Sequence, residues 1–506
     1  MDNFLQVKNG QAVSRTDIPD IDFDTFQHTI LETTLYGGFV VQFFAYQDEQ
    51  KQLRIIAVLR SGSHLYVVSS QIDHEFSSFT PECEKFHMFE REIAEQFGVR
   101  PLEHPWLKMV RYHPNYLGRK DVFGNDYSED IPGRYPYFSV EGEAVHEVAV
   151  GPVHAGIIEP GHFRFQCCGE EVFSLEIQLG YQHRGAEKLL EKPGMPLHRL
   201  PVIVESIAGD TAIGHSLCHS QAIEALAGLE VNQESKVIRC VALELERIAN
   251  HIGDLGALSG DVAFNPPLNY FGRIRGEFLN LSMTMAGNRF GKGLVRPGGL
   301  AFPVYEEQRR IMIDKVKGET PGIDHVCDLL FSAHTVLSRF ENTGTVKRKM
   351  AELLGLVGYA GRGCGLSYDC RVTYPTEAYD QIEANRNKCT NGDVYSRANV
   401  RREEIMHSLR IIPELLEPLN DALPVATPGS HQLAPDSFVV TMNEAWRGEV
   451  SHCLLTDKNG AILRYKVKDP SFHNWTGLAM SLRNQGISDF PLCNKSFNLS
   501  YCGFDL

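Results

Sequence analysis

The segment between residues 234 and 258 is the feature that most constrains the fold. Apolar residues recur there at steps of three or four, namely Val237, Val241, Leu245, Ile248, Ile252 and Leu255. This spacing predicts one long helix with a single apolar face. Polar residues follow the same steps as a second stripe, which consists of Glu244, Arg247, His251 and Asp254. We expect a helix of a bundle whose polar stripe is solvated or paired internally rather than a catalytic site.

The first 112 residues predict a small α+β domain. Residues 38–45 and 53–59 are rich in β-branched and aromatic residues, which is typical of strands. A helix should follow, because apolar residues at positions 86, 89, 93 and 97 step by three or four. Gly98 is placed to end that helix, since glycine adopts the left-handed conformation that closes helix C-termini.

The remaining chain predicts a linker and a large, mainly helical domain. Residues 113–146 are rich in Pro, Gly, Tyr and Asp without a sustained period, which indicates a linker. Short strands are expected at residues 147–150 and 163–165, helical patterns dominate to about residue 430, and residues 451–467 predict a β-hairpin that turns at 458–460. The fold class is therefore α+β, with a helix bundle and peripheral β-strands in residues 147–506.

Charge and hydropathy exclude several classes of protein. The chain of 506 residues carries a net charge of -15 and has no long basic run, which argues against nucleic acid as a partner. The N-terminus lacks a signal peptide, and no apolar run approaches the ~20 residues of a membrane-spanning helix. We expect a cytoplasmic protein that reaches a membrane only through partners.

Common catalytic motifs are also absent from the sequence. The twelve cysteines form no Cys-x-x-Cys pair, so most are expected to be reduced, buried core residues. No Gly-x-Gly-x-x-Gly follows a strand, and neither a Walker loop nor a Gly-x-Ser-x-Gly elbow occurs. A nicotinamide site on this chain is therefore not expected.

Several motifs in the same order nevertheless resemble one family. Residues 90–99 and 104–107 resemble the signature of the smaller (30-kDa) peripheral-arm subunit of respiratory complex I. Segments 151–163, 179–188, 244–254, 296–299, 392–397 and 469–475 resemble the large (49-kDa) subunit. Together they resemble the fused large subunit of group 4 membrane-bound [NiFe]-hydrogenases of the formate hydrogenlyase and hydrogenase-4 type. This resemblance implies a 30-kDa-like domain at 1–112 and a 49-kDa-like domain at 147–506.

The resemblance also shows what this sequence lacks. In the hydrogenases two cysteine pairs hold nickel and iron, and the matching positions here are Ala208, Thr211, Ser500 and Gly503. Because thiolates are the ligands that such a soft metal needs, no metal is expected on this chain. Cys502 is one residue out of register and alone.

The resemblance points to candidate site residues around the same cavity. Glu159 matches the glutamate with which group 4 hydrogenases pass protons, although it could instead pair with Arg184. His154 could relay a proton or be structural. In complex I a quinone headgroup is held by a tyrosine and a histidine, and the matching residues here are His219 and Ile158. The candidate catalytic residues are Glu159, His154, His215 and His219, and the candidate cofactor-binding residues are Cys218 and Arg296, although a packed helix start is the alternative for segment 215–219.

The function implied by the resemblance is that of an oxidoreductase subunit related to NADH dehydrogenase. The chain would form the electron- and proton-transfer cavity beside a [4Fe-4S] cluster on a small partner subunit, with no cofactor of its own, and quinone is left open as a ligand. Integral membrane subunits would be its other partners, and it would lie on the inner face of the cell membrane. One alternative is a catalytically silent adaptor between cluster subunit and membrane arm, and another is a hydrogenase with a nonstandard metal site.

Overall fold

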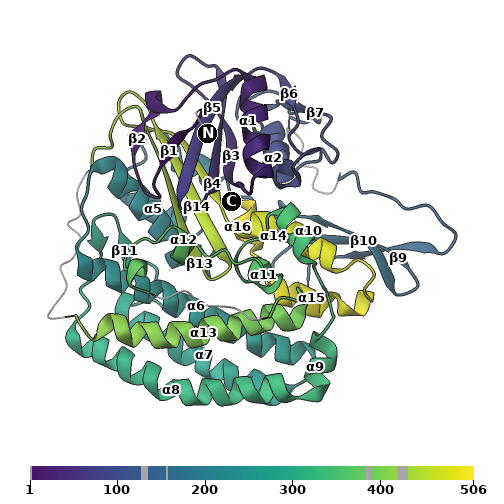
Figure 1. Cartoon of the computed structure of the whole chain (residues 1–506), viewed down its shortest axis with the longest axis vertical. Coiled ribbons are helices and arrows are strands. Elements are labelled where there is room, and N and C mark those ends of the chain that lie inside the picture. Colours follow the sequence, from purple (N-terminus) through teal and green to yellow (C-terminus); the bar gives the residue numbers. More distant parts are fainter. Residues whose placement is uncertain (1–2, 127–134, 155–157, 383–388, 420–430) are drawn as a thin grey trace.

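The N-terminal part is a four-stranded antiparallel sheet with helices packed on it (Figure 1). The computed structural model describes residues 3–126, 135–154, 158–382, 389–419 and 431–506. The sheet has the order β1-β5-β4-β3, from strands β1 (Leu5–Val7), β3 (Phe39–Gln47), β4 (Leu53–Ser61) and β5 (His64–Ile72). Helices α1 (Phe23–Leu35) and α2 (His87–Phe97) cover it. Both expected strands and the helix are present, and Gly98 ends α2 at φ 63°.

A second four-stranded sheet lies against the first. Its order is β15-β14-β13-β2, formed by β2 (Val13–Ser14), β13 (Ser437–Ala445), β14 (Gly448–Thr456) and β15 (Ile462–Lys468). The expected hairpin is thus β14–β15. One apolar cluster contains side chains of both sheets, such as Phe44 and Val440, so the two sheets share a core. The edge strand β2 belongs to the N-terminal part of the chain and pairs with β13.

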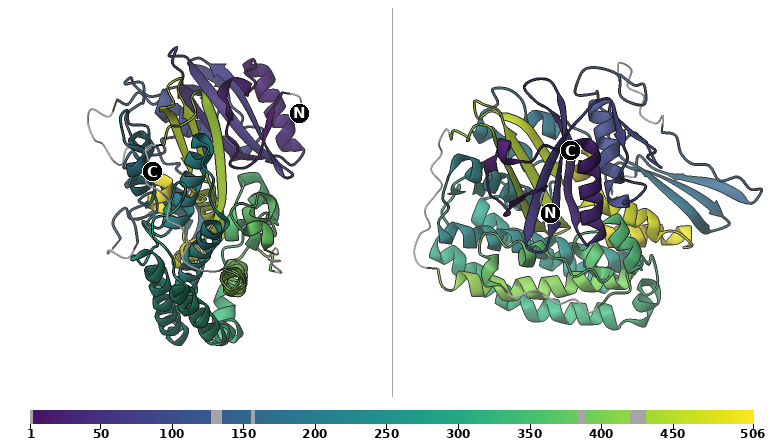
Figure 2. Two further views of the ribbon diagram at one scale, coloured as in Figure 1. Left: turned by 90° about the vertical axis from the view of Figure 1, so that its left-hand side faces the viewer. Right: turned by 45° about the horizontal axis from the view of Figure 1, so that its top comes forward.

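Four long helices form a separate layer below the two sheets (Figures 1 and 2). They are α6 (Gln233–Asp261), α7 (Asn265–Ala286), α8 (Glu306–Ser332) and α13 (Val394–Leu416). Helix α5 (Ala212–Ala227) lies between this layer and the C-terminal sheet, because it contacts β13, β14 and α6. The helix expected at 234–258 is α6. In the part of the chain that the structure describes, no helix is long and apolar enough to cross a bilayer.

The polar stripe of α6 is buried and paired, so a solvated stripe is excluded. Glu244 lies 3.0 Å from the Arg247 Nε. Asp254 accepts from Arg401 of α13 at 3.0 Å, and His251 Nε2 lies 2.8 Å from a Glu404 carboxylate oxygen. Each buried charge therefore has a partner, as charges out of contact with water require.

A three-stranded antiparallel sheet projects from one side of the molecule (Figure 1). It consists of β8 (Val145–Val150), β9 (His162–Cys168) and β10 (Glu171–Gln178), and it includes both strands expected at its positions. Helices α14 (Ser471–Ser481), α15 (Phe490–Phe497) and α16 (Tyr501–Asp505) pack at its base. Within residues 103–126 and 135–144 the structure has no regular helix or strand.

Short elements complete the chain. They are β6 (Glu75–Ser77), β7 (Arg100–Leu102), α3 (Ala186–Leu190), α4 (Leu200–Val204), β11 (Val295–Arg296), β12 (Gly299–Leu300), α9 (His334–Phe340), α10 (Arg348–Leu354), α11 (Gly358–Gly363) and α12 (Cys370–Thr373). The whole is a mixed α+β structure.

Buried ion pairs join the N-terminal helix α2 to the C-terminal strand β15. The Lys466 ammonium lies 2.7 Å from Glu92 of α2 and 2.8 Å from Glu187 of α3. Arg464 of β15 lies 3.0 Å from Glu187, and Arg111 pairs with Glu92. Because each of these charges is buried, the two halves are held together by a network that loses much stability if one member is removed.

Candidate functional site

Two arginines bring together the two segments that match the thiolate positions of the hydrogenases. Arg184 donates to the carbonyl oxygens of Ser206, Ile207 and Cys502, at 2.5, 2.9 and 3.3 Å. Arg447 donates to the Asn498 carbonyl oxygen at 2.7 Å and to the Asp210 carboxylate at 2.6 Å. Segments 206–211 and 498–503, almost 300 residues apart in sequence, therefore lie side by side.

The residues at this junction do not fit a nickel–iron centre. A Cβ atom at Gly503 would lie 2.7 Å from Asp469 Oδ2 and 2.8 Å from Ser500 Oγ, which is closer than real Cβ contacts. The Thr211 hydroxyl accepts from the Trp446 indole N–H at 3.1 Å. Carboxylate and hydroxyl oxygens thus occupy the space, and they are poor ligands for a soft metal.

Cysteines elsewhere do not replace those ligands. All twelve are free thiols, and Cys168, Cys389 and Cys502 are the half-buried ones while the others are buried. Burial and the nearby Glu159 raise the pKa of Cys502 to about 11, so it stays a thiol at neutral pH. Among the described residues no group of three or more His, Cys, Asp or Glu side chains is arranged to hold a metal ion.

Glu159 faces the C-terminal helix α16. Its Oε2 accepts the Tyr501 N–H at 3.2 Å, and its charge helps to raise the pKa values of Cys502 and Asp505. Burial is the main cause that raises the pKa of Asp505 to about 7. The Arg184 guanidinium donates to backbone carbonyl oxygens. Within the described residues it forms no ion pair with Glu159. Glu159 is half-buried.

His154 holds the two ends of the opening loop together. Its Nε2 lies 2.8 Å from the Gly161 carbonyl oxygen, so this nitrogen carries the proton and donates. Gly151 has φ 83°, and an added Cβ would strike both the His154 ring and the Gly161 oxygen. The geometry gives His154 a positioning contact, and residues 155–157 of the same motif lie outside the described residues.

His215 and His219 belong to a buried chain of five polar side chains. His215 Nε2 lies 3.2 Å from Asp469 Oδ2, and His215 Nδ1 lies 3.1 Å from His452 Nε2. The Tyr465 hydroxyl lies 2.9 Å from His452 Nδ1 and 2.9 Å from His219 Nδ1. None of the five side chains is more than 1% exposed. The two histidines are one turn apart on α5, with His452 on β14 and Tyr465 on β15.

The electrostatics of this chain favour neutral rings for His219 and His452 and an ionised carboxylate for Asp469. Burial and the Arg296 charge lower the pKa of His219 to about 3, and burial with the charges of His215 and His219 lowers that of His452. Burial raises the pKa of Asp469, but the hydrogen bond from His215 and its charge outweigh that effect and leave it below its usual range. Burial raises the pKa of Tyr465, which stays protonated.

The two candidate cofactor-binding residues lie apart from each other. Cys218 accepts from the Asn443 side-chain amide at 3.1 Å and approaches the Val450 carbonyl oxygen, so it faces strands β13 and β14. Burial raises its pKa to about 12, which makes it an inert core thiol. Arg296, the last residue of β11, donates to Glu205 at 2.6 Å and lies near His219.

A buried carboxyl caps the start of α5. Glu246 of α6 accepts the N–H groups of Ile213 at 2.8 Å and Gly214 at 3.2 Å. Burial raises its pKa to about 8 despite these two hydrogen bonds, and the Asp210 charge adds to the shift. Glu246 is therefore protonated at neutral pH, next to the segment where the thiolates are absent.

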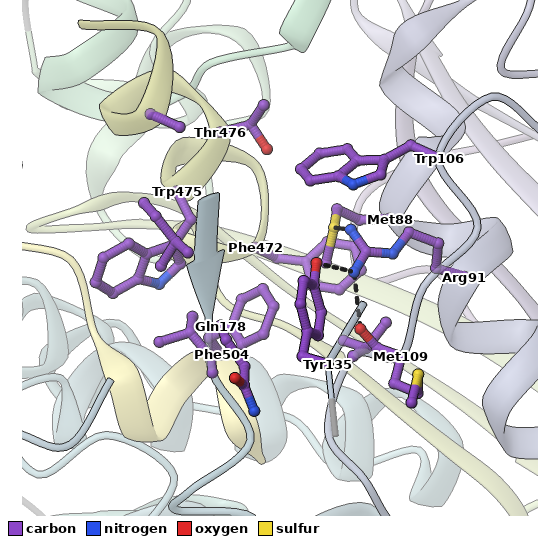
Figure 3. A pocket seen from close by; sticks show the side chains of 14 residues that line it. Met88, Arg91, Trp106, Met109, Tyr135, Gln178, Phe472, Trp475, Thr476 and Phe504 are labelled. Carbon is purple, nitrogen blue, oxygen red and sulfur yellow. Dashed lines mark hydrogen bonds between the residues drawn. The ribbon is translucent and has the colours of Figure 1, made fainter. Parts of the chain in front are cut away.

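The residues present do not fit a quinone headgroup held by the pair that complex I uses. His219 has no exposed surface, and Ile158 is apolar and 39% exposed. Figure 3 shows a cavity elsewhere, between Arg91 and Trp106 on one side and Trp475 and Thr476 of α14 on the other. Its volume is about 40 Å³, enough for a few water molecules at most, and none of the six candidate residues lines it.

Sequence reasoning missed His452, Tyr465, Arg447 and Asp469. Only Asp469 belonged to a recognised motif, the segment at 469–475. The other three lie on β14, β15 and the turn before β14, where alternation marks inward positions but does not say which partner they meet. A polar residue at an inward position of a buried strand was the one signal that could have found His452 and Tyr465.

Comparisons with known proteins agree with this architecture. Residues 261–434 match the family described as "Respiratory-chain NADH dehydrogenase, 49 Kd subunit". The chain is 27% identical to Hydrogenase-4 component G of Escherichia coli (strain K12) over 446 residues, which cover 86% of this chain and 77% of that protein. It is 30% identical to an NADH-quinone oxidoreductase subunit of Herpetosiphon aurantiacus over 365 residues, which cover 70% of this chain and 96% of that one.

A solved structure shares the fold. It is a chain of the membrane-bound sulfane sulfur reductase, an archaeal respiratory membrane complex, with a TM-score of 0.67 and 22% identity over 72% of this chain and 99% of that chain. The relatives are thus subunits of membrane-bound hydrogenases and of complex I-type oxidoreductases. On this similarity the chain belongs to the 49-kDa subunit family of respiratory-chain NADH dehydrogenase, an oxidoreductase-subunit family.

Proposed function

We propose that this chain is the large subunit of a membrane-associated, energy-converting oxidoreductase related to group 4 hydrogenases and complex I, without a nickel–iron centre of its own. The observation that carries the proposal is the junction of segments 206–211 and 498–503. Its shape is kept by Arg184 and Arg447, while the Asp469 carboxylate fills the space of a metal ligand. Such a junction can transfer protons beside a redox centre that another subunit supplies.

The proposed partners follow from the family. A small subunit with a [4Fe-4S] cluster would deliver electrons next to the opening loop, and integral membrane subunits would anchor the complex on the inner face of the cell membrane. In this proposal residues 1–112 act as the 30-kDa-like domain and residues 147–506 as the 49-kDa-like domain, linked by 113–146. The chain itself binds no redox cofactor.

Glu159 is the proposed proton-exchanging residue of the opening loop. It is half-buried, it faces α16, and it lies close enough to Cys502 and Asp505 to raise their pKa values. Burial raises the pKa of the neighbouring Asp505 to about 7, and this carboxyl lies beside Glu159 at the edge of the junction. A proton can therefore be held there at neutral pH.

The proposal is tested on the complex purified from its membrane, with ferredoxin, NADH and quinones screened as electron donors and acceptors. Glu159→Gln should lower coupled turnover by at least tenfold while assembly stays normal, because glutamine cannot exchange a proton. Glu170→Gln, the same change at an exposed turn between β9 and β10, serves as the matched control and should behave as wild type. Equal turnover of the two variants would favour the silent adaptor instead.

Elemental analysis of the same preparation tests the rest of the proposal. Iron bound by the partner subunit is expected, and nickel is not. Stoichiometric nickel would refute the proposed loss of the metal centre and support a hydrogenase with a nonstandard site. The absence of any iron–sulfur partner from the purified complex would refute the electron-transfer role.

A further inference from the structure

We propose that Asp469, His215, His452, Tyr465 and His219 form an ordered relay. It carries a proton between the thiolate-free junction, at Asp469, and the buried side chain of His219 on α5. This inference rests on the proposed function, because a redox event beside the junction would supply or consume the proton. The four hydrogen bonds of the relay measure 2.9 to 3.2 Å, so every neighbouring pair is in direct contact.

The Asp469 end fixes the protonation of the two histidines next to it. An ionised carboxylate only accepts, so His215 Nε2 must carry a proton and donate to Asp469 Oδ2. In a neutral ring His215 Nδ1 is then a bare acceptor. His452 Nε2 must therefore carry the proton that fills the 3.1 Å contact between the two rings.

The same reasoning continues through the tyrosine. Because His452 Nε2 is the protonated nitrogen, His452 Nδ1 is bare and accepts the Tyr465 hydroxyl proton. The Tyr465 oxygen has then spent its only proton and can only accept, so His219 Nδ1–H donates to it. All four hydrogen bonds therefore have the same direction, with each donor on the His219 side and each acceptor on the Asp469 side.

The relay ends in a bare nitrogen. His219 Nε2 is left with a lone pair, it has no exposed surface, and within the described part of the chain it has no hydrogen-bond partner. An unpaired buried nitrogen offers a free lone pair at which a proton can bind. An unpaired acceptor at one end and a carboxylate at the other are what a proton path requires.

The charges at the two ends keep an added proton moving. Arg447 contributes to lowering the pKa of Asp469, and Arg296 contributes to lowering that of His219. Both are cations, so a histidinium in the chain would be repelled from both sides. A proton that enters is therefore not trapped on a ring.

The transfer balances for one proton delivered to the His219 end. A proton binds to His219 Nε2, and His219 Nδ1–H passes its proton to the Tyr465 oxygen. The Tyr465 hydroxyl proton passes to His452 Nδ1, the His452 Nε2 proton passes to His215 Nδ1, and the His215 Nε2 proton passes to Asp469 Oδ2. One proton enters and one is bound by Asp469, the polarity of every hydrogen bond is reversed, and the opposite sequence returns the proton.

Substitution of the tyrosine breaks the relay at its centre. Tyr465→Phe removes one oxygen and keeps the ring in its place. In the purified complex it should lower turnover at least tenfold and change the solvent deuterium isotope effect, because proton transfer then limits the rate. Tyr359→Phe is the matched control, since Tyr359 is also fully buried and donates to the Phe497 carbonyl oxygen outside the relay. Tyr465→Phe turnover within twofold of that control would overturn the proposal.

Two further measurements keep the test decisive. If Tyr465→Phe fails to assemble, Asp469→Asn replaces it, because asparagine still accepts from His215 but cannot take up a proton, and the same tenfold loss is expected. Solid-state ¹⁵N NMR of the histidine-labelled complex should show protons on His219 Nδ1, His215 Nε2 and His452 Nε2, and any other pattern overturns the ordered relay even if turnover is normal. Absence of redox turnover in the wild-type complex refutes the proposed function instead, and the NMR pattern still decides the relay.

Discussion

Replacing Gly503 by alanine tests whether Asp469 has taken the space of a metal ligand. Gly503 lies within the short helix α16, and its φ is not positive, so backbone conformation does not oppose the change. The new Cβ would lie 2.7 Å from Asp469 Oδ2 and 2.8 Å from Ser500 Oγ. Relief requires one of these oxygens to move. Movement of Asp469 breaks its contact with His215, and movement of Ser500 breaks the cap on the Gly503 N–H.

The magnitude follows from two opposing effects. Alanine stabilises a helical position by about 0.5–1 kcal/mol relative to glycine. Overpacking of a filled site costs about 1–3 kcal/mol. We therefore expect Gly503→Ala to lower the free energy of unfolding by about 1 kcal/mol, within the range of roughly 0–2.5 kcal/mol that the difference of those two ranges spans. Gly209→Ala is the matched control, because a Cβ at Gly209 meets no atom within 4 Å in the facing segment, and it should be neutral or slightly stabilising.

Thermal unfolding of the two variants and of a double mutant measures the effect. Ser500→Ala removes one of the two close contacts, so Gly503→Ala should cost less in the Ser500→Ala background by at least about 0.5 kcal/mol. Equal unfolding midpoints for Gly503→Ala and Gly209→Ala would refute the crowding. That result would mean that a side chain fits at position 503 and that the space for a thiolate is still open.

Two further substitutions test the buried charges. Glu246→Gln should weaken the pH dependence of the melting temperature. Because the pKa of Glu246 is about 8 in the folded state and near 4.5 in the unfolded state, its stabilising contribution is complete below pH 4.5 and is lost as the pH rises through 8. The melting temperature of the variant should therefore fall less than that of wild type between pH 5 and 8.5, and parallel curves would contradict the raised pKa. Lys466→Met should lower the free energy of unfolding by about 3–5 kcal/mol, because Glu92 and Glu187 lose their shared cation. Lys458→Met, at the exposed turn of the same hairpin, is the control and should change the free energy of unfolding little. Equal denaturation midpoints for the two variants would show that the network does not hold the two halves together.

Local patterns predicted the elements that neighbouring residues determine. The recurrence of apolar residues every three or four positions predicted α6, and the turn at 458–460 between two apolar runs predicted the β14–β15 hairpin. Gly98 ended α2 as expected, since the left-handed conformation there needs no tertiary partner. The pairing of β2 with β13 could not be predicted. Strand β2 has only two residues, and their sequence pattern does not indicate which strand, some 420 positions away, they pair with.

The candidate site was predictable only in part. The family resemblance singled out His215, His219 and Glu159 as candidates, but it did not predict the partners of the two histidines. His215 meets His452, 237 residues later, and Asp469, 254 residues later. The polar stripe of α6 shows the same dependence, because only the position of Glu404 on α13 decides that His251 is paired and not solvated. Spacing along one helix determines a face of that helix but not the surface that it meets.

The two arginines explain how the junction keeps its shape without metal ligands. In the resembling hydrogenases a metal joins the two segments through thiolates. Here Arg184 reaches Ile207 and Cys502 with the same terminal nitrogen, and Arg447 joins Asn498 to Asp210. A planar guanidinium with five donors suits such cross-links, since it can satisfy several carbonyl and carboxylate oxygens at once. In the proposed function, fixed cations thus replace the positive charge that the metal would have carried, and the Arg447 charge helps to keep the Asp469 carboxylate ionised.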